Sequence, residues 1–462
     1  MSANKTGHFR IGQDGNIRGA SEAGQNALEI AMEELQIFDN IHVNTSLREA
    51  EIHEITPETH PQGLEPVTFE ISGSNSHYYD LANTLLHLQL MITNADGTKL
   101  DDDCTKVYIT PGQQIFHSLI SKFSILLNHK QVEDNVNYAY KAFVTNVLNH
   151  DEGAKRTHLR AVGWIPDGMF EEHSDNLTGA QDACMKARAA ALAGSPVLDL
   201  IGRMNSPLFM QKKFMLPGIS MRFELQFNSP QFVLQHIKGI TDPHNYKIVI
   251  TKASMLMRRL EVHPSIGISH IESLRKTQAK YVINGTDVKL FTISPGRQSE
   301  NLTVLQNKPE PKMIILGLTK HTAKNGSYEH SPFKFEPFNL SSINVMVNNN
   351  YVLKKPLDMN FEKNIYMRAY HNLQSVCGKT FTEQGNNITP DHFKSSLCLY
   401  AFDLTTDWCH GEGTHLQRIS DTKIELTFSQ PLDETVNLMV YYEYDDVLNI
   451  DEFRNPSLAT VS

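Results

Sequence analysis

The most regular feature of the chain is an alternation of apolar and polar residues, which begins at Val67 and recurs almost to the C-terminus. A period of two predicts β-strands with one buried and one exposed face. The segments that show it are 67–71, 86–92, 221–227, 246–250 and 255–262 in the first half, and 288–293, 313–318, 343–347, 424–428 and 436–444 in the second. In the strand 221–227, Phe223 and Leu225 are expected to face inward. Each half therefore reads as an all-β sandwich of short strands.

Turn sequences separate these strands. Examples are Ala95-Asp96-Gly97, Asn284-Gly285 and Asn325-Gly326, in which glycine or asparagine supplies the backbone conformation that a tight turn requires.

Helical periodicity interrupts the strands in a few places. Segments 136–149 and 361–376 predict helices, each after the strand-turn-strand unit of its half. A third, alanine-rich segment, 180–193, lies in a long irregular insertion at about residues 150–200. Such an insertion in a sandwich is expected to form functional surface or subunit contacts.

Residues 1–65 are expected to form an arm and not a domain. Leu28, Ala31, Met32 and Leu35 fall at helical spacing, so 26–38 predicts one short amphipathic helix. This helix either packs on its own domain or docks on a neighbouring subunit. The arm up to residue 60 is expected to be dispensable for folding.

Four short segments recur in the same order in the two halves, at offsets of about 200 to 230 residues. The pairs are 69–72 with 291–294, 124–132 with 344–352, 141–143 with 368–370, and 223–230 with 424–431. A length of 462 residues also exceeds what one core usually supports. We therefore predict two similar domains, 66–264 and 265–453, flanked by the arm 1–65 and a C-terminal tail, 454–462.

Composition is that of a globular protein, with 40% apolar and 20% charged residues. No stretch is apolar enough for a membrane span, and the polar start is unlike a signal peptide, so we expect an intracellular location before any assembly or release. Five cysteines without a CxxC pair favour reduced thiols. A net charge of −10 disfavours a large nucleic-acid face. Any attraction for nucleic acid is expected to come from a local basic patch, for example Lys5, Arg10 and Arg18 of the arm.

Candidate catalytic and metal sites fail on spacing. Gly378-Lys379-Thr380 lacks the first glycine of a phosphate-binding loop, because Leu373 stands there. His53-Glu54 has Pro57 where a zinc protease needs its second histidine. Two further clusters lack a complete ligand set: Cys409 with His410 and His415, and Asp101 to Asp103. No GxSxG elbow and no His-x-His occurs. We therefore expect no catalytic residue, no metal site and no cofactor.

Several phrases of the chain together resemble the double jelly-roll major capsid proteins of Polinton (Maverick) elements and adintoviruses. The matching segments are 69–73 with 79–84, 117–119 through 127–128, 281–293, 325–328, 332–333, 338–340, 400–404 and 440–445. The resemblance spans about residues 66 to 453 and is weakest in the insertion.

This resemblance implies two tandem eight-stranded jelly rolls, all-β with helical insertions. It further implies a non-enzymatic viral major capsid protein whose homotrimeric, pseudo-hexagonal capsomers (hexons) tile an icosahedral capsid around a double-stranded DNA genome. Expected partners are neighbouring capsomers and a penton or minor capsid protein at the vertices, with weak or no direct contact to nucleic acid. The expected location is the virion.

Two alternatives stay open at this point. A carbohydrate-binding or carbohydrate-processing protein can also carry two jelly rolls, and Trp164 and Trp408 are the tryptophans available as sugar platforms. A minor or penton capsid protein is the other alternative, although such proteins commonly have a single roll.

Overall fold

The computed structural model describes residues 9–11, 17–19, 45–61, 63–103, 107, 109–164, 188–236, 245–405, 415 and 418–458. The chain divides into two compact units, 1–47 and 48–462. In the first, β1 (Phe9–Ile11) and β2 (Ile17–Gly19) pair in antiparallel fashion. The predicted helix 26–38 lies outside the described residues.

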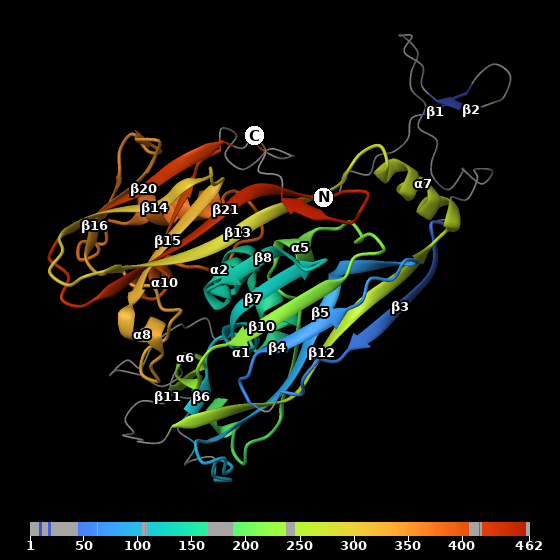
Figure 1. Ribbon diagram of the computed structural model, residues 1–462. Coiled ribbons are helices and arrows are strands. Elements are labelled where there is room, and N and C mark those ends of the chain that lie inside the picture. Colours follow the sequence, from blue (N-terminus) through green and yellow to red (C-terminus); the bar gives the residue numbers. More distant parts are fainter. Residues whose placement is uncertain are drawn as a thin grey trace. The chain divides into compact units, whose positions relative to one another are not determined.

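The first jelly roll has eight strands in two antiparallel sheets (Figure 1). The strands in chain order are β3 (Leu47–Ile55), β4 (Val67–Ile71), β5 (His77–Asn94), β7 (Ile120–Leu127), β8 (Lys130–Val136), β9 (Leu198–Gly202), β10 (Met221–Phe227) and β12 (Tyr246–Val262). One sheet has the order β3-β12-β5-β9 and the other β4-β10-β7-β8. A small ribbon of β6 (Ile109–Pro111) and β11 (Leu234–His236) is added to them.

The second jelly roll has the same construction. Its strands are β13 (Ala279–Ile293), β14 (Ser299–Pro309), β15 (Met313–Lys320), β16 (Leu340–Val347), β17 (Asn350–Tyr351), β19 (Leu399–Asp403), β20 (Ile419–Phe428) and β21 (Val436–Ile450). The sheet orders are β13-β21-β15-β19 and β14-β20-β16-β17, with β18 (Leu357–Asp358) on β16 and β22 (Pro456–Leu458) on β21.

The two rolls have one topology. Counted along each roll, one sheet joins strands one, eight, three and six, and the other joins strands two, seven, four and five. This strand order, in which successive strands other than the pair four and five lie in opposite facing sheets, is that of a jelly roll. The predicted fold, a double jelly roll with helical insertions, is confirmed.

Three of the four internal sequence matches join equivalent elements. Segments 124–132 and 344–352 are the hairpins β7–β8 and β16–β17, 141–143 and 368–370 lie in the helices that follow them, and 223–230 and 424–431 cover β10 and β20. The fourth match is wrong, because 69–71 belongs to the second strand of its roll and 291–293 to the first strand of the other. Short alternating strands look alike wherever they stand in a sheet.

The first sheet begins earlier than the sequence predicts. Strand β3 lies within the segment expected to be the arm, yet it pairs with β12 at the edge of the sheet. Seven of its residues, 48–54, are exposed on both faces, so its sequence lacks the buried stripe that reveals other strands. A deletion of residues 1–60 would thus remove a strand of the first roll.

Two predicted helices are present, as α2 (Tyr138–Asn149) and α9 (Met367–Val376). In the insertion, the described residues form α3 (Glu152–Arg156) and a 3-10 helix, His158–Val162, while most of the predicted helix 180–193 lies outside the described part. The remaining helices are α1 (Ile115–Ser118), α5 (Pro207–Met210), α6 (Pro230–Val233), α7 (Pro264–Leu274), α8 (His321–Asn325) and α10 (Pro390–Ser395). Within the described part of the chain, no helix is long and apolar enough to cross a membrane.

The predicted turn at Asn284-Gly285 is wrong, because both residues lie inside the continuous strand β13. Gly285 is paired with Tyr444 of β21, and a Cβ atom on Gly285 would stand 2.4 Å from the Tyr444 ring. Glycine is required here because the ring occupies the space of a side chain. The other two glycines do mark turns, with φ of 88° at Gly97 and 98° at Gly326.

The inward facing of β10 is confirmed, and it generates a first prediction. Phe223 is fully buried between Phe123, whose ring is parallel to it at 6.3 Å, and Phe209, at 5.6 Å. We expect Phe223→Asp to abolish soluble folded protein, because it buries an unpaired charge, and Phe223→Ala to cost about 3–5 kcal/mol.

Expression, circular dichroism and urea denaturation measure both effects. Ile419→Asp, at a strand position that is 58% exposed, is the matched control and should fold. A normally folded Phe223→Asp protein would show that the core of the first roll lies elsewhere.

Candidate functional site

The junction between the two jelly rolls is formed around helix α2. Residues 138–148 of this helix are all buried. Phe143 stacks on Phe333 of the second roll at 4.6 Å between ring centres, with Phe335 at 6.2 Å and Trp164 of the insertion at 6.4 Å. A helix of the first roll thus shares one aromatic core with the β15–β16 connection of the second, which holds the rolls together as one unit.

Polar contacts fix the register of this junction. At the start of α2, Asn137 donates from Nδ2 to the carbonyl of Val288 at 3.1 Å. The Tyr281 hydroxyl in β13 donates to the carbonyl of Phe214 and accepts from the amide of Leu216, at 3.1 and 3.2 Å. These bonds are directional, so they select one relative placement of two otherwise apolar surfaces.

The C-terminal segment also links the two rolls. Arg454 donates from Nε to the carbonyl of Pro217 at 2.9 Å, and its own carbonyl accepts from Nδ2 of Asn128 at 2.7 Å. Strand β22, which begins two residues later, pairs with β21 of the second roll. Part of the predicted tail, 454–462, is therefore structural.

Lys155 crosses the junction as a buried cation. Its ammonium donates to the carbonyl of Asn386 in the second roll at 2.6 Å and to that of Val147 at 3.3 Å, and lies 5.6 Å from the centre of the Trp164 ring. Burial is the main cause that lowers the pKa of Lys155 to about 8.

A second buried lysine lies on α2 itself. Lys141 donates to Oδ1 of Asn135 at 2.7 Å and approaches Oε1 of Glu133 at 3.4 Å. Burial lowers its pKa, and the neighbouring Glu133 opposes that shift. Lys141 also borders a cavity of about 440 Å³ at the junction, together with Lys312, Tyr441 and Glu443. The cavity has charged groups of both signs, and each is bonded to the protein: Lys312 to Asp445 at 2.8 Å, and the Tyr441 hydroxyl to Glu443.

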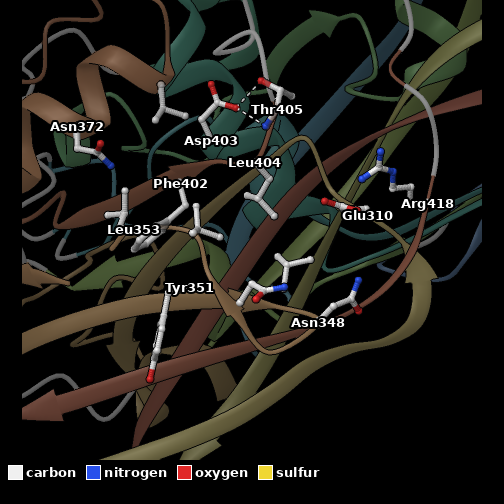
Figure 2. A pocket seen from close by; sticks show the side chains of 14 residues that line it. Glu310, Asn348, Tyr351, Leu353, Asn372, Phe402, Asp403, Leu404, Thr405 and Arg418 are labelled. Atoms are coloured by element: carbon white, nitrogen blue, oxygen red, sulfur yellow. Dashed lines mark hydrogen bonds between the residues drawn. The ribbon is translucent and has the colours of Figure 1, made fainter. Parts of the chain in front are cut away.

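A further cavity, of about 430 Å³, opens in the second roll between the β16–β17 hairpin and the end of β19 (Figure 2). Asp403 accepts from the amide and hydroxyl of Thr405 at 2.8 and 2.6 Å, and Tyr351 donates to Glu425 at 3.1 Å. Asn372 reaches the carbonyl of Ala401. The described residues that line this cavity include no serine, cysteine or histidine.

The motifs singled out in the sequence are scattered over the structure. Gly378 follows the C-terminus of α9 with φ of 64°, the left-handed conformation that commonly ends a helix. The Lys379 ammonium donates to the carbonyl of Asn149, the last residue of α2, at 3.5 Å. This triplet therefore caps helices. His53 is exposed on β3, and His415 bonds Asp445. Cys409, His410 and Trp408 lie outside the described residues, as does Lys5. Across the described ranges, no group of three His, Cys, Asp or Glu could hold a metal ion.

The lysines at the junction were missed by sequence reasoning. Lys141 is the lone charge in an otherwise mostly apolar helix, which is a signal that could have been used. The sequence around Lys155 gives no such signal, because the neighbouring residues are polar. Lys155 is buried by contacts with the second roll, which the local sequence does not reveal.

Comparison with known proteins gives one curated relative. No family model matches the sequence. The chain is similar to F54H12.2, an uncharacterised protein of Caenorhabditis elegans, with 22% identity over 410 residues that cover 87% of this chain and 94% of the relative.

Solved structures show where else this fold occurs. A chain of the Sputnik virophage matches with a TM-score of 0.61 and 12% identity, covering 96% of this chain and 95% of its own. The mavirus major capsid protein matches with a TM-score of 0.53 and 11% identity, covering 95% and 97%. A chain of the PBCV-1 virus capsid matches with 0.54 and 10%, covering 92% and 100%. The chain has the double jelly-roll fold of viral major capsid proteins.

The burial of Lys155 predicts a pH dependence of stability. The unfolded chain keeps the proton on this lysine up to about pH 10.4, whereas the folded chain releases it above about pH 8. Raising the pH through this window therefore favours the folded state. Relative to Lys155→Met, the wild-type protein should gain stability, on the order of 1–3 kcal/mol, between about pH 7 and about pH 9.5.

Urea denaturation of both proteins at each pH measures the difference. The exposed Lys363 provides the control, since Lys363→Met should follow the wild type at every pH. Parallel curves for wild type and Lys155→Met would contradict the buried cation.

Proposed function

We propose that this protein is a viral major capsid protein whose chains form homotrimeric capsomers. The observation that carries the proposal is the identical strand order of two jelly rolls fused in one chain. Three copies of such a chain present six similar rolls around a three-fold axis, which gives a near-hexagonal unit that can tile a curved shell.

The fused junction supports this proposal. Because α2 and the Phe333 segment share one aromatic core, the two rolls act as one rigid block, as a tile must. The structural neighbours of viral origin have the same pair of rolls.

The finer features follow from the same proposal. The capsomers tile an icosahedral shell around a double-stranded DNA genome, with a penton or minor capsid protein at the vertices, and the protein is located in the virion. The virus is of the Polinton or adintovirus type, which the resemblance of segments such as 69–73, 79–84 and 281–293 supports. With a net charge of −10, the shell is held by contacts between proteins, and direct binding of the genome is weak or absent.

We also infer that the chain is not an enzyme. The described residues that line the cavity of about 430 Å³ include no serine, cysteine or histidine, and in the cavity of about 440 Å³ His415 bonds Asp445 and Glu443 accepts from the Tyr441 hydroxyl. The carbohydrate-binding alternative is weakened, because Trp164 is only 4% exposed and stacks on Phe143, so its ring is not available to stack on a sugar.

The mass of the purified chain in solution tests the capsomer. Light scattering at low micromolar concentration should give three times the chain mass of 52.2 kDa. A monomer that also persists at concentrations a hundredfold higher would contradict self-assembly into capsomers.

Removal of the arm tests how capsomers join. Deletion of residues 1–44 leaves every described strand of both rolls in place, so it should preserve the fold and the trimer while changing the assembly of trimers into larger particles, seen by electron microscopy. Deletion of 1–60 is the contrasting variant, because it removes β3 and should lower the melting temperature. Loss of the trimer in the shorter deletion would place the arm inside the capsomer.

A further inference from the structure

Strand β3 leaves an open sheet edge on the first jelly roll. It is nine residues long and pairs on one side with β12; among the described residues, no strand pairs with its other side. Its side chains from Arg48 to Glu54 are exposed on both faces, and Ile52 is 74% exposed. A long open edge offers unpaired N–H and C=O groups to another strand, and proteins usually block such edges.

The usual blocking devices are weak in this strand. It contains no lysine, no proline and no glycine. Three of its charged side chains bond residues of β12: Arg48 bonds Glu261 at 3.0 Å, Glu51 bonds Arg259, and Glu54 bonds Lys252 at 3.0 Å. These exposed ion pairs are individually weak, but they keep the strand extended and its backbone edge accessible.

The sequence of β3 is complementary to itself in antiparallel orientation. When two copies pair with Glu51 at the centre, Arg48 stands opposite Glu54, Glu49 opposite His53, and Ala50 opposite Ile52. Arg48 then faces the opposite charge of Glu54 at both ends of the pair, and Ala50 and Ile52 meet between them. The two central Glu51 carboxylates repel each other, but each is neutralised by its own Arg259, whose Nε donates at 2.6 Å.

We propose that the outer edge of β3 pairs with the outer edge of β3 of a second copy of this chain, across a two-fold axis centred on Glu51. Such a contact is isologous, whereas the contacts within a three-fold ring are heterologous. The β3 pair therefore joins two different capsomers. The position of the β3 pair between two capsomers rests on the proposed function, whereas the pairing of two chains through β3 does not.

The pair is a weak contact by itself, because a single pair of strands buries far less than the roughly 1,200 Å² of a standard interface. In a shell it is repeated at many equivalent positions, and the contacts of one capsomer then act together. A weak, repeated contact also lets wrongly placed capsomers leave before the shell closes.

Disulfide trapping tests the pairing and its register. Directly opposite residues in an antiparallel pair have Cα atoms about 4.5 or 5.5 Å apart, within the range of about 4.4–6.8 Å that a disulfide spans. The full-length Glu51→Cys protein, oxidised with glutathione disulfide, should form a chain dimer on non-reducing gels. Glu49→Cys and His53→Cys should not do so alone, but an equal mixture of the two should form the heterodimer.

The outcomes are separate for the pairing and for the capsomer. No dimer of Glu51→Cys above the wild-type background, in a protein that forms trimers, overturns the β3 pair and leaves the capsomer standing. A Glu51→Cys dimer in a protein that never forms trimers supports the pair and contradicts the capsomer. A dimer of Glu49→Cys alone overturns the register that is centred on Glu51.

A charge placed on the edge gives a second test. In the Glu51→Cys background, Ile52→Lys should reduce the yield of trapped dimer at least fivefold, because two lysines then stand close to the two-fold axis. Ile268→Lys on α7, at an apolar position that is 59% exposed, is the control and should leave the yield unchanged. An equal yield with Ile52→Lys would contradict the pairing.

Discussion

The burial of helix α2 between two sandwiches is the contact on which the rest of this structure depends. Each jelly roll has its own closed pair of sheets, but α2 has no solvent-facing side from Tyr138 to Leu148, and the second roll supplies part of its cover through Phe333 and Phe335. Burial of this apolar surface thus holds the two domains together as one compact unit. The hydrogen bonds from Asn137 and Tyr281 fix the relative orientation of the two rolls but add little to the free energy of folding.

The buried lysines show how such a junction obtains specificity. An apolar surface alone tolerates sliding, whereas an ammonium that must reach the carbonyl of Asn386 does not. Burial of Lys155 and Lys141 has a cost, which appears as their lowered pKa values. In exchange, the directional contact between Lys155 and the Asn386 carbonyl defines one placement of one roll on the other.

Much of the fold could be predicted from the sequence, because most strands bury one face and so alternate visibly, as Phe223 and Leu225 do in β10. What escaped prediction has physical reasons. Strand β3 buries only Ile55, so alternation carries no signal there, and its pairing depends on β12, some 200 residues away. The turn expected at Asn284-Gly285 failed because glycine serves there to admit the ring of Tyr444. The burial of Lys155 comes from contacts with the second roll, which local patterns do not encode.

The shared core has a consequence for synthesis on the ribosome. The first roll can form its sheets once β12 has emerged, but the ring of Phe143 has no stacking partner from the second roll until residues 333 to 335 follow. The hydrogen bonds of Asn128 and of the Pro217 carbonyl with Arg454 form later still, because Arg454 lies near the C-terminus. A nascent first roll therefore exposes an aromatic surface for the time needed to translate about 70 further residues, on the order of ten seconds at typical rates. During that interval, neighbouring nascent chains on one messenger present the same uncovered surface to one another.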